Sequence, residues 1–131
     1  MNEIPGSAFV PQLIISHGTM DLEFYKKAFG ATETKHITNE DGSIHVSEMV
    51  IDGAMFHFHE ESSDGTTFSP EKHNGVTTTI GLMVADVDAV MARALAAGAR
   101  EISPAKSHDY GYRQGLIMDP LGHQWLIEMV L

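Results

Sequence analysis

The chain has 131 residues, 43% of them apolar and 20% charged, which is typical of one compact globular domain. It contains no cysteine, which excludes disulfides, thiolate metal sites and cysteine nucleophiles. Its 8 basic and 18 acidic side chains give a formal net charge of −10, which argues against a nucleic-acid partner, because phosphate binding needs clustered Lys and Arg.

The N-terminal segment 1–9 has no cationic region followed by an apolar stretch, so no signal peptide is expected. No run in the chain approaches the ~18 apolar residues that span a membrane. We therefore expect a cytoplasmic protein without a membrane partner.

The first half of the chain predicts a strand, a helix and three further strands. An apolar run over 9–15 is typical of a buried strand, and apolar residues at helical spacing over 22–29 predict a helix that ends at Gly30. The three following strands are expected at 31–37, 44–51 and 54–60.

The second half predicts the same order of elements. Segment 61–75 is polar and rich in Ser, Thr and Gly, and we expect it to be a linker loop. A β-branched strand follows over 76–84, and Asp86 is placed to cap a helix that ends at Gly98. The closing strands are expected at 100–105, 115–118 and 124–130.

The matching order of elements indicates a duplication. Both predicted helices end in Gly-Ala, at Gly30-Ala31 and at Gly98-Ala99. We expect a single domain, 1–131, made of two repeats over 8–60 and 76–131. Each strand-helix-strands unit exposes one sheet face, which two copies can bury or enclose together.

Three segments carry a resemblance to a known family: 11–31, 84–99 and 110–125. In their order and spacing they resemble the glyoxalase/bleomycin resistance/extradiol dioxygenase (vicinal oxygen chelate) superfamily, and within it the PhnB-like branch. The resemblance implies an α+β fold in which two tandem βαβββ modules form a curved mixed sheet around a pocket. It also implies a homodimer.

Enzymes of that superfamily hold a divalent metal with residues from the first and fourth strands of each module. Carried over by spacing, these positions fall on Val10, His57, Thr79 and Leu126. Val and Leu cannot coordinate a metal, neutral Thr is a poor ligand, and a single His does not hold one. The chain thus resembles the metal-free members, which predicts a small organic ligand and no cofactor.

The predicted pocket combines the aligned positions with neighbours on the same strand face, since side chains two residues apart share a face. Arg113 lies beside two tyrosines, where it would bind a carboxylate or phosphate or form a structural salt bridge. The predicted ligand-binding residues are Gln12, His57, His59, Thr79, Tyr110, Tyr112, Arg113, Leu126 and Glu128.

Two alternatives stay open. A displaced metal site formed by His57, His59 and Glu128 would make the chain a lyase, isomerase or dioxygenase that depends on Zn, Ni, Mn, Mg or Fe. In the other alternative the sheet serves only dimerisation and the chain is an interaction module. No catalytic residue is assigned.

The sequence also predicts the local environment of four further residues. His45 and Glu48 lie on opposite faces of a regular strand and are not expected to be partners. Trp125 is expected in the core, and Asp119 is expected to order its own turn by accepting backbone N–H bonds.

Overall fold

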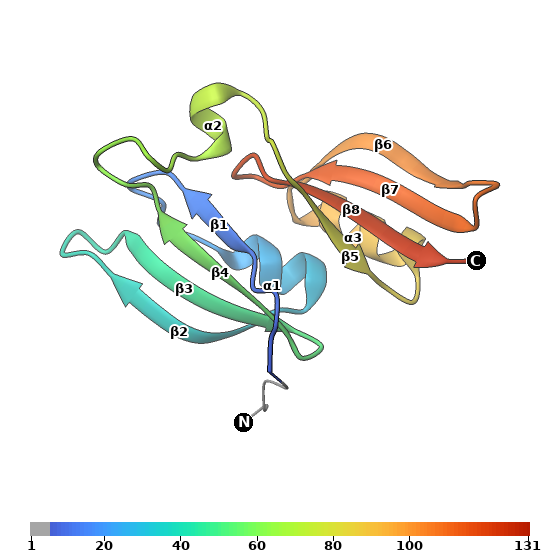
Figure 1. Cartoon of the computed structure of the whole chain (residues 1–131), viewed down its shortest axis with the longest axis horizontal. Helices are drawn as coiled ribbons and strands as arrows, with labels where there is room; N and C mark the ends of the chain where they lie inside the picture. Colours follow the sequence, from blue (N-terminus) through green and yellow to red (C-terminus); the bar gives the residue numbers. More distant parts are fainter. Residues whose placement is uncertain (1–5) are drawn as a thin grey trace. The chain divides into compact units, whose positions relative to one another are not determined.

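The computed structural model describes residues 6–131, which form two compact units (Figure 1). The first unit comprises the described residues up to Asp21 together with Ala31–Ser69. The second comprises Leu22–Gly30 and Pro70–Leu131. Each unit contains one sheet, and the two sheets have the same internal order.

The first unit is built on a 4-stranded mixed sheet. In sheet order its strands are β1 (Gln12–Ile15), β4 (Ala54–Glu60), β3 (Ile44–Ile51) and β2 (Thr32–Thr38). Strand β1 runs parallel to β4, and the other neighbours are antiparallel.

The second unit repeats this arrangement in its own 4-stranded sheet. In sheet order its strands are β5 (Thr79–Met83), β8 (Gln124–Val130), β7 (Tyr112–Met118) and β6 (Arg100–Ser107). Its helices are α1 (Glu23–Phe29), α2 (Pro70–His73) and α3 (Val87–Ala97). The predicted α+β fold of tandem βαβββ modules is confirmed.

The core of the first unit is formed by the buried residues that alternate with more exposed ones along β1 and β4. Leu13 and Phe58 are buried and pair across the two parallel strands, and Phe58 packs against Phe56 with ring centroids 5.5 Å apart. Because successive strand residues point to opposite faces, His57 and His59 lie on the other, open face.

The core of the second unit contains a buried carboxylate. Asp119 Oδ2 accepts hydrogen bonds from Tyr25 Oη at 2.7 Å and from Trp125 Nε1 at 2.9 Å. Its Oδ1 accepts from the backbone N–H groups of Leu121 and His123 at 2.9 and 3.1 Å. The predictions for Trp125 and Asp119 are confirmed, and the carboxylate also joins α1 to the closing hairpin.

Stability at alkaline pH is expected to depend on Tyr25. Burial, and then the charge of Asp119, raises the pKa of Tyr25 well above its ordinary value of 10.0. Above that pH the unfolded chain loses a proton that the folded chain keeps, so stability falls as pH rises, by up to about 1.4 kcal/mol per pH unit. The free energy of unfolding in urea, measured between neutral pH and about pH 11, should fall less steeply with pH in Tyr25→Phe than in the parent. Equal slopes would contradict this assignment.

Most predicted elements are present, with shifted ends. Asp86 caps α3 by accepting from the Ala89 N–H at 3.0 Å, and Gly98 ends that helix with φ 118°. Strand β1 begins at Gln12 rather than at residue 9, and the predicted linker loop contains the short helix α2. Strands β6 and β7 extend closer to their hairpin turn than expected, because their pairing reaches Ser107 opposite Arg113.

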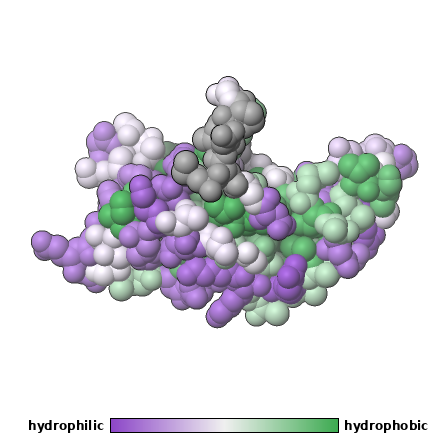
Figure 2. All heavy atoms as spheres, turned by 90° about the horizontal axis from the view of Figure 1, so that it is seen from below, coloured by the Kyte–Doolittle hydropathy of each residue, from purple (hydrophilic) through white to green (hydrophobic). Residues whose placement is uncertain are grey.

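Hydrophilic and hydrophobic residues are mixed on the face of the molecule seen in Figure 2. Large apolar side chains are exposed at several positions, including Phe9, Met20 and Met83. Among the described residues, no helix has the length and apolar character needed to cross a membrane.

Candidate functional site

A row of polar side chains crosses the open face of the first sheet, one from each strand. Gln12 on β1 is in register with His57 on β4, His57 with Glu48 on β3, and Glu48 with Lys35 on β2. Gln12 Nε2 lies 3.0 Å from His57 Nδ1, His57 Nε2 lies 3.8 Å from Glu48 Oε1, and Lys35 Nζ lies 3.7 Å from Glu48 Oε2. Strand pairing therefore assembles a histidine, an amide, a carboxylate and an amine on one surface.

The amide of Gln12 sets the tautomer of His57. Gln12 Nε2 also lies 3.5 Å from the carbonyl oxygen of Val10, which can only accept, so this amide atom is the donor. His57 Nδ1 then accepts, and neutral His57 carries its proton on Nε2. His57 thus presents an N–H group toward Glu48.

That N–H group of His57 is buried and has no hydrogen-bond partner within residues 6–131. The nearest carboxylate oxygen, at 3.8 Å, is beyond hydrogen-bonding distance. A buried donor without a partner costs about 1–3 kcal/mol, and natural structures keep few of them. His57 Nε2 is therefore a donor available to an incoming acceptor.

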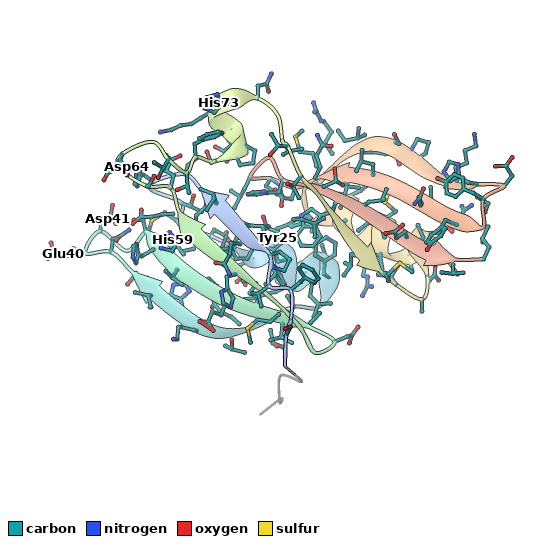
Figure 3. All side chains as sticks on the ribbon, in the orientation of Figure 1. Tyr25, Glu40, Asp41, His59, Asp64 and His73 are labelled. Atoms are coloured by element: carbon teal, nitrogen blue, oxygen red, sulfur yellow. The ribbon has the colours of Figure 1, made fainter. Side chains whose placement is uncertain are left out.

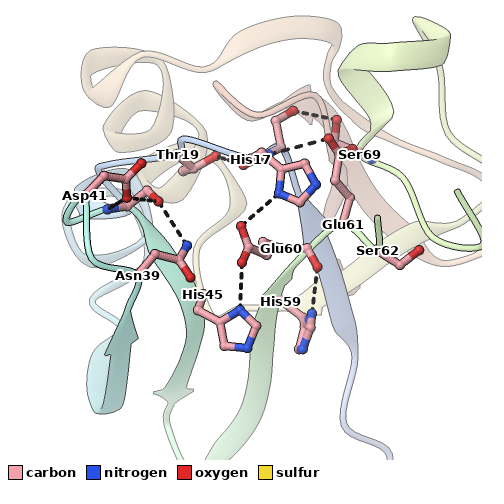
Figure 4. A network of polar contacts seen from close by, with 12 residues as sticks. His17, Thr19, Asn39, Asp41, His45, His59, Glu60, Glu61, Ser62 and Ser69 are labelled. Carbon is pink, nitrogen blue, oxygen red and sulfur yellow. Dashed lines mark hydrogen bonds and ion pairs between the residues drawn. The ribbon is translucent and has the colours of Figure 1, made fainter. Parts of the chain in front are cut away.

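A second polar cluster lies at the end of the same sheet, around Glu60 (Figure 4). Glu60 Oε2 accepts from His17 Nδ1 at 3.0 Å, and Glu60 Oε1 accepts from His45 Nδ1 at 2.7 Å. The hydrogen bond from His17, followed by that from His45, lowers the pKa of the Glu60 carboxyl, so Glu60 stays ionised and can only accept. His59 Nδ1 donates to the backbone oxygen of Glu60 at 2.7 Å, and its ring lies 5.0 Å from that of His45.

A register shift places His45 in this cluster. Ile37 pairs with Val46 but the next residue, Thr38, pairs with Ile44, so His45 is an extra residue on β3. Such a β-bulge redirects a side chain. The bulge makes the strand irregular and brings the His45 ring to 5.0 Å from that of His59 on the open face, so the expected opposite placement of His45 and Glu48 does not hold. The two are not partners, as expected: His45 bonds to Glu60, and Glu48 lies near Lys35 and His57. Sequence alternation missed His45, since a bulge leaves no mark in the periodicity.

The predicted residues of the second unit also make defined contacts. Tyr110 Oη donates to Gln114 Oε1, and Gln114 Nε2 donates to Glu128 Oε1 at 2.9 Å. The Tyr110 ring stacks on His108 at 4.8 Å and lies 6.2 Å from Tyr112. Thr79 begins β5, and Leu126 pairs with Gly81 on that strand.

The guanidinium of Arg113 is held by an aspartate. Arg113 Nε and Nη2 donate to the two carboxylate oxygens of Asp88 at 2.9 and 2.8 Å, and Nη1 donates to Ser107 at 3.1 Å. The hydrogen bond lowers the pKa of Asp88 and raises that of Arg113. Of the two roles predicted for Arg113, the ion pair is present, and a ligand anion would have to compete with Asp88.

The positions aligned with family metal ligands do not fit a metal. Val10 and Leu126 have no donor atom, and Thr79 offers only a neutral hydroxyl. The lone pair on His57 Nδ1 is already hydrogen-bonded to Gln12. Within residues 6–131, no group of 3 or more His, Asp and Glu side chains is arranged to hold a metal ion.

Comparison with known proteins identifies the family. A model of the glyoxalase/bleomycin resistance protein/dioxygenase superfamily matches residues 13–127. The chain belongs to this superfamily. Its PhnB-like branch stays a prediction.

Relatives of this superfamily member include proteins from bacteria and plants. It is 32% identical over 121 residues to the uncharacterized protein Mb0911c of Mycobacterium bovis, covering 90% of this chain and 80% of that one. The crystal structure of the Arabidopsis thaliana At5g48480 product has a TM-score of 0.70 at 28% identity, over 92% of this chain and 97% of that one. The fosfomycin resistance protein FosX of Listeria monocytogenes has a TM-score of 0.67 at 17% identity, over 98% and 96% of the two chains, and shares the fold.

Proposed function

We propose that this protein binds a small organic molecule without a metal, on the open face of its first sheet. The observation that carries the proposal is the buried Nε2–H of His57, which has no hydrogen-bond partner in the part of the chain that the structure describes. Ligand sites combine apolar surface with a few well-placed polar groups. Here Gln12, His57 and His59 supply the polar groups, and Ile14 and Val46 lie in register with His59 on the neighbouring strands.

The ligand is expected to carry a hydrogen-bond acceptor beside a donor. His57 offers an N–H group, and the Glu48 carboxylate lies next to it. A ligand hydroxyl can accept from the first and donate to the second, which gives the buried Nε2–H of His57 an acceptor. The ligand-binding roles of Thr79, Tyr110, Tyr112, Arg113, Leu126 and Glu128 in the second unit stay predictions.

The chemistry of the aligned positions supports a site without a metal. Only His57 among them has an ordinary ligand atom, and its Nδ1 is engaged by Gln12. The expectations of a homodimer and of a cytoplasmic location stay predictions.

Replacing His57 should separate ligand binding from folding. In His57→Phe the bound ligand's acceptor is left unpaired, which costs about 1–3 kcal/mol, so affinity should fall about tenfold or more. His57→Gln should retain more affinity, since its amide nitrogen can occupy nearly the same position. The ligand is first found by a thermal-shift screen of small organic compounds on chelator-treated protein, and affinities are then measured by calorimetry.

The matched control is His36→Phe, an exposed histidine on β2 whose Nδ1 lies 2.8 Å from Glu33. It should leave ligand affinity unchanged. The proposal fails if chelator-treated protein binds no compound in the screen, or if tag-free protein is purified with one tightly held transition metal per chain.

A further inference from the structure

A pair of histidines in the Glu60 cluster has the tautomers of metal ligands. His45 Nδ1 faces a carboxylate oxygen and His59 Nδ1 faces a carbonyl oxygen, and neither acceptor can donate. Both Nδ1 atoms therefore carry the proton, and both Nε2 atoms have a free lone pair when the rings are neutral. Histidines that bind metals almost always donate their second N–H in this way, to a carboxylate or a backbone carbonyl.

The spacing of the two rings fits one shared ion. The ring centroids of His45 and His59 are 5.0 Å apart (Figure 4). With metal–nitrogen bonds of about 2.0–2.1 Å and tetrahedral angles, two imidazoles bound to one ion through Nε2 place their centroids about 5 Å apart. Among the described residues, neither Nε2 atom has a hydrogen-bond partner in the fold.

The surroundings of the pair favour a cation that solvent can reach. The His59 side chain projects from β4 on the open face (Figure 3), and the His45 side chain is 42% exposed. The Glu60 carboxylate bonded to His45 adds negative charge behind the ring and raises its basicity as a ligand. His17 holds the other oxygen of Glu60 and so fixes the orientation of the carboxylate.

We propose that His45 and His59 form a two-imidazole site for an exchangeable borderline dication of the Zn²⁺, Ni²⁺ or Cu²⁺ class. Imidazole nitrogens suit these ions. With two protein ligands, the remaining coordination positions belong to water or to a bound chelating molecule. The site differs from the aligned family positions. It shares only His59 with the alternative of His57, His59 and Glu128, because its second ligand is the bulged residue His45. The inference goes beyond the proposed function and does not depend on it.

Calorimetric titration of chelator-treated protein with Zn²⁺, and separately with Ni²⁺, tests the site. One ion per chain should bind and be removed readily by a chelator. His45→Gln and His59→Gln should each weaken binding more than about tenfold, and Glu60→Gln, which removes the carboxylate behind His45, by about tenfold or more. The His45 side chain is 42% exposed and His59 is also exposed, so the two histidine variants should unfold at the parent's temperature. Glu60 is 13% exposed and accepts from His17 and His45, so the unfolding temperature of Glu60→Gln is measured alongside its affinity.

Two controls make the titration specific. His36→Gln should leave the affinity unchanged, although His36 is also an exposed strand histidine beside a glutamate. His57→Gln should likewise leave it unchanged. Nitrogen-15 NMR spectra test the site in the parent protein, without any substitution. Addition of Zn²⁺ should shift the Nε2 signals of His45 and His59 and should leave the Nε2 signal of His57 unchanged.

The proposal fails if the parent binds no ion, if His45→Gln keeps the parent's affinity, or if His36→Gln loses as much affinity as His45→Gln. Loss of Zn²⁺ affinity in His57→Gln with His45→Gln unaffected would also overturn it, and would contradict the metal-free binding proposal as well. Because ligand binding is measured on chelator-treated protein, either proposal can fail while the other holds.

Discussion

Asp119→Ala should lower the free energy of unfolding by about 3–5 kcal/mol. The Asp119 side chain is 3% exposed and accepts hydrogen bonds from Tyr25 and Trp125. Its removal leaves a buried hydroxyl and a buried indole N–H without this acceptor, at about 1–3 kcal/mol each. It also removes the acceptor that orders the turn at Leu121 and His123. Urea unfolding followed by circular dichroism measures the change.

Asp109→Ala is the matched control, because Asp109 lies exposed in the turn between β6 and β7. It should change stability by no more than about 0.5 kcal/mol. A loss in Asp119→Ala as small as that of the control would show that the buried carboxylate does not hold α1 to the closing hairpin.

Phe58→Ala should also cost about 3–5 kcal/mol, in the first unit. Phe58 is 0% exposed, packs against Phe56, and pairs with Leu13 and Ser47 on the two neighbouring strands. Truncation to Ala removes the ring and leaves a cavity that the sheet can close only in part. Thermal and urea unfolding should both report the loss.

Phe9→Ala provides the comparison, because Phe9 is 100% exposed. That variant should keep the parent's stability within about 0.5 kcal/mol. If the two phenylalanine variants behaved alike, Phe58 would not be the core residue that its burial indicates.

The proposed ligand site at His57 and the proposed ion site at His45 and His59 lie on the same open face of the first sheet. His57 presents a buried donor and His59 a free lone pair, and the two side chains are two residues apart on β4. A ligand held by His57 would therefore lie near the proposed ion site, where open coordination positions could meet its oxygen atoms. Ligand affinity measured with and without Zn²⁺ would report any coupling between the two sites.

Signals between residues close together in the sequence were sufficient to predict the fold. The helix stops at Gly30 and Gly98, the cap at Asp86 and the alternation around His57 each depend on neighbours within a few residues along the chain. Repetition of the same element order then indicated two modules, and the family match over residues 13–127 agrees with that prediction.

The candidate sites depended on tertiary structure. The bulge that brings His45 to Glu60 results from pairing with β2, and the tautomer of His57 results from an amide on β1 that is 45 residues away in sequence. Asp119 likewise meets Tyr25 across 94 residues. Helix caps and strand alternation depend on short-range backbone geometry, so residues that are neighbours in the sequence are enough to predict them. Register and cross-strand partners are decided by which distant side chains pack and satisfy each other, so only the folded chain decided them.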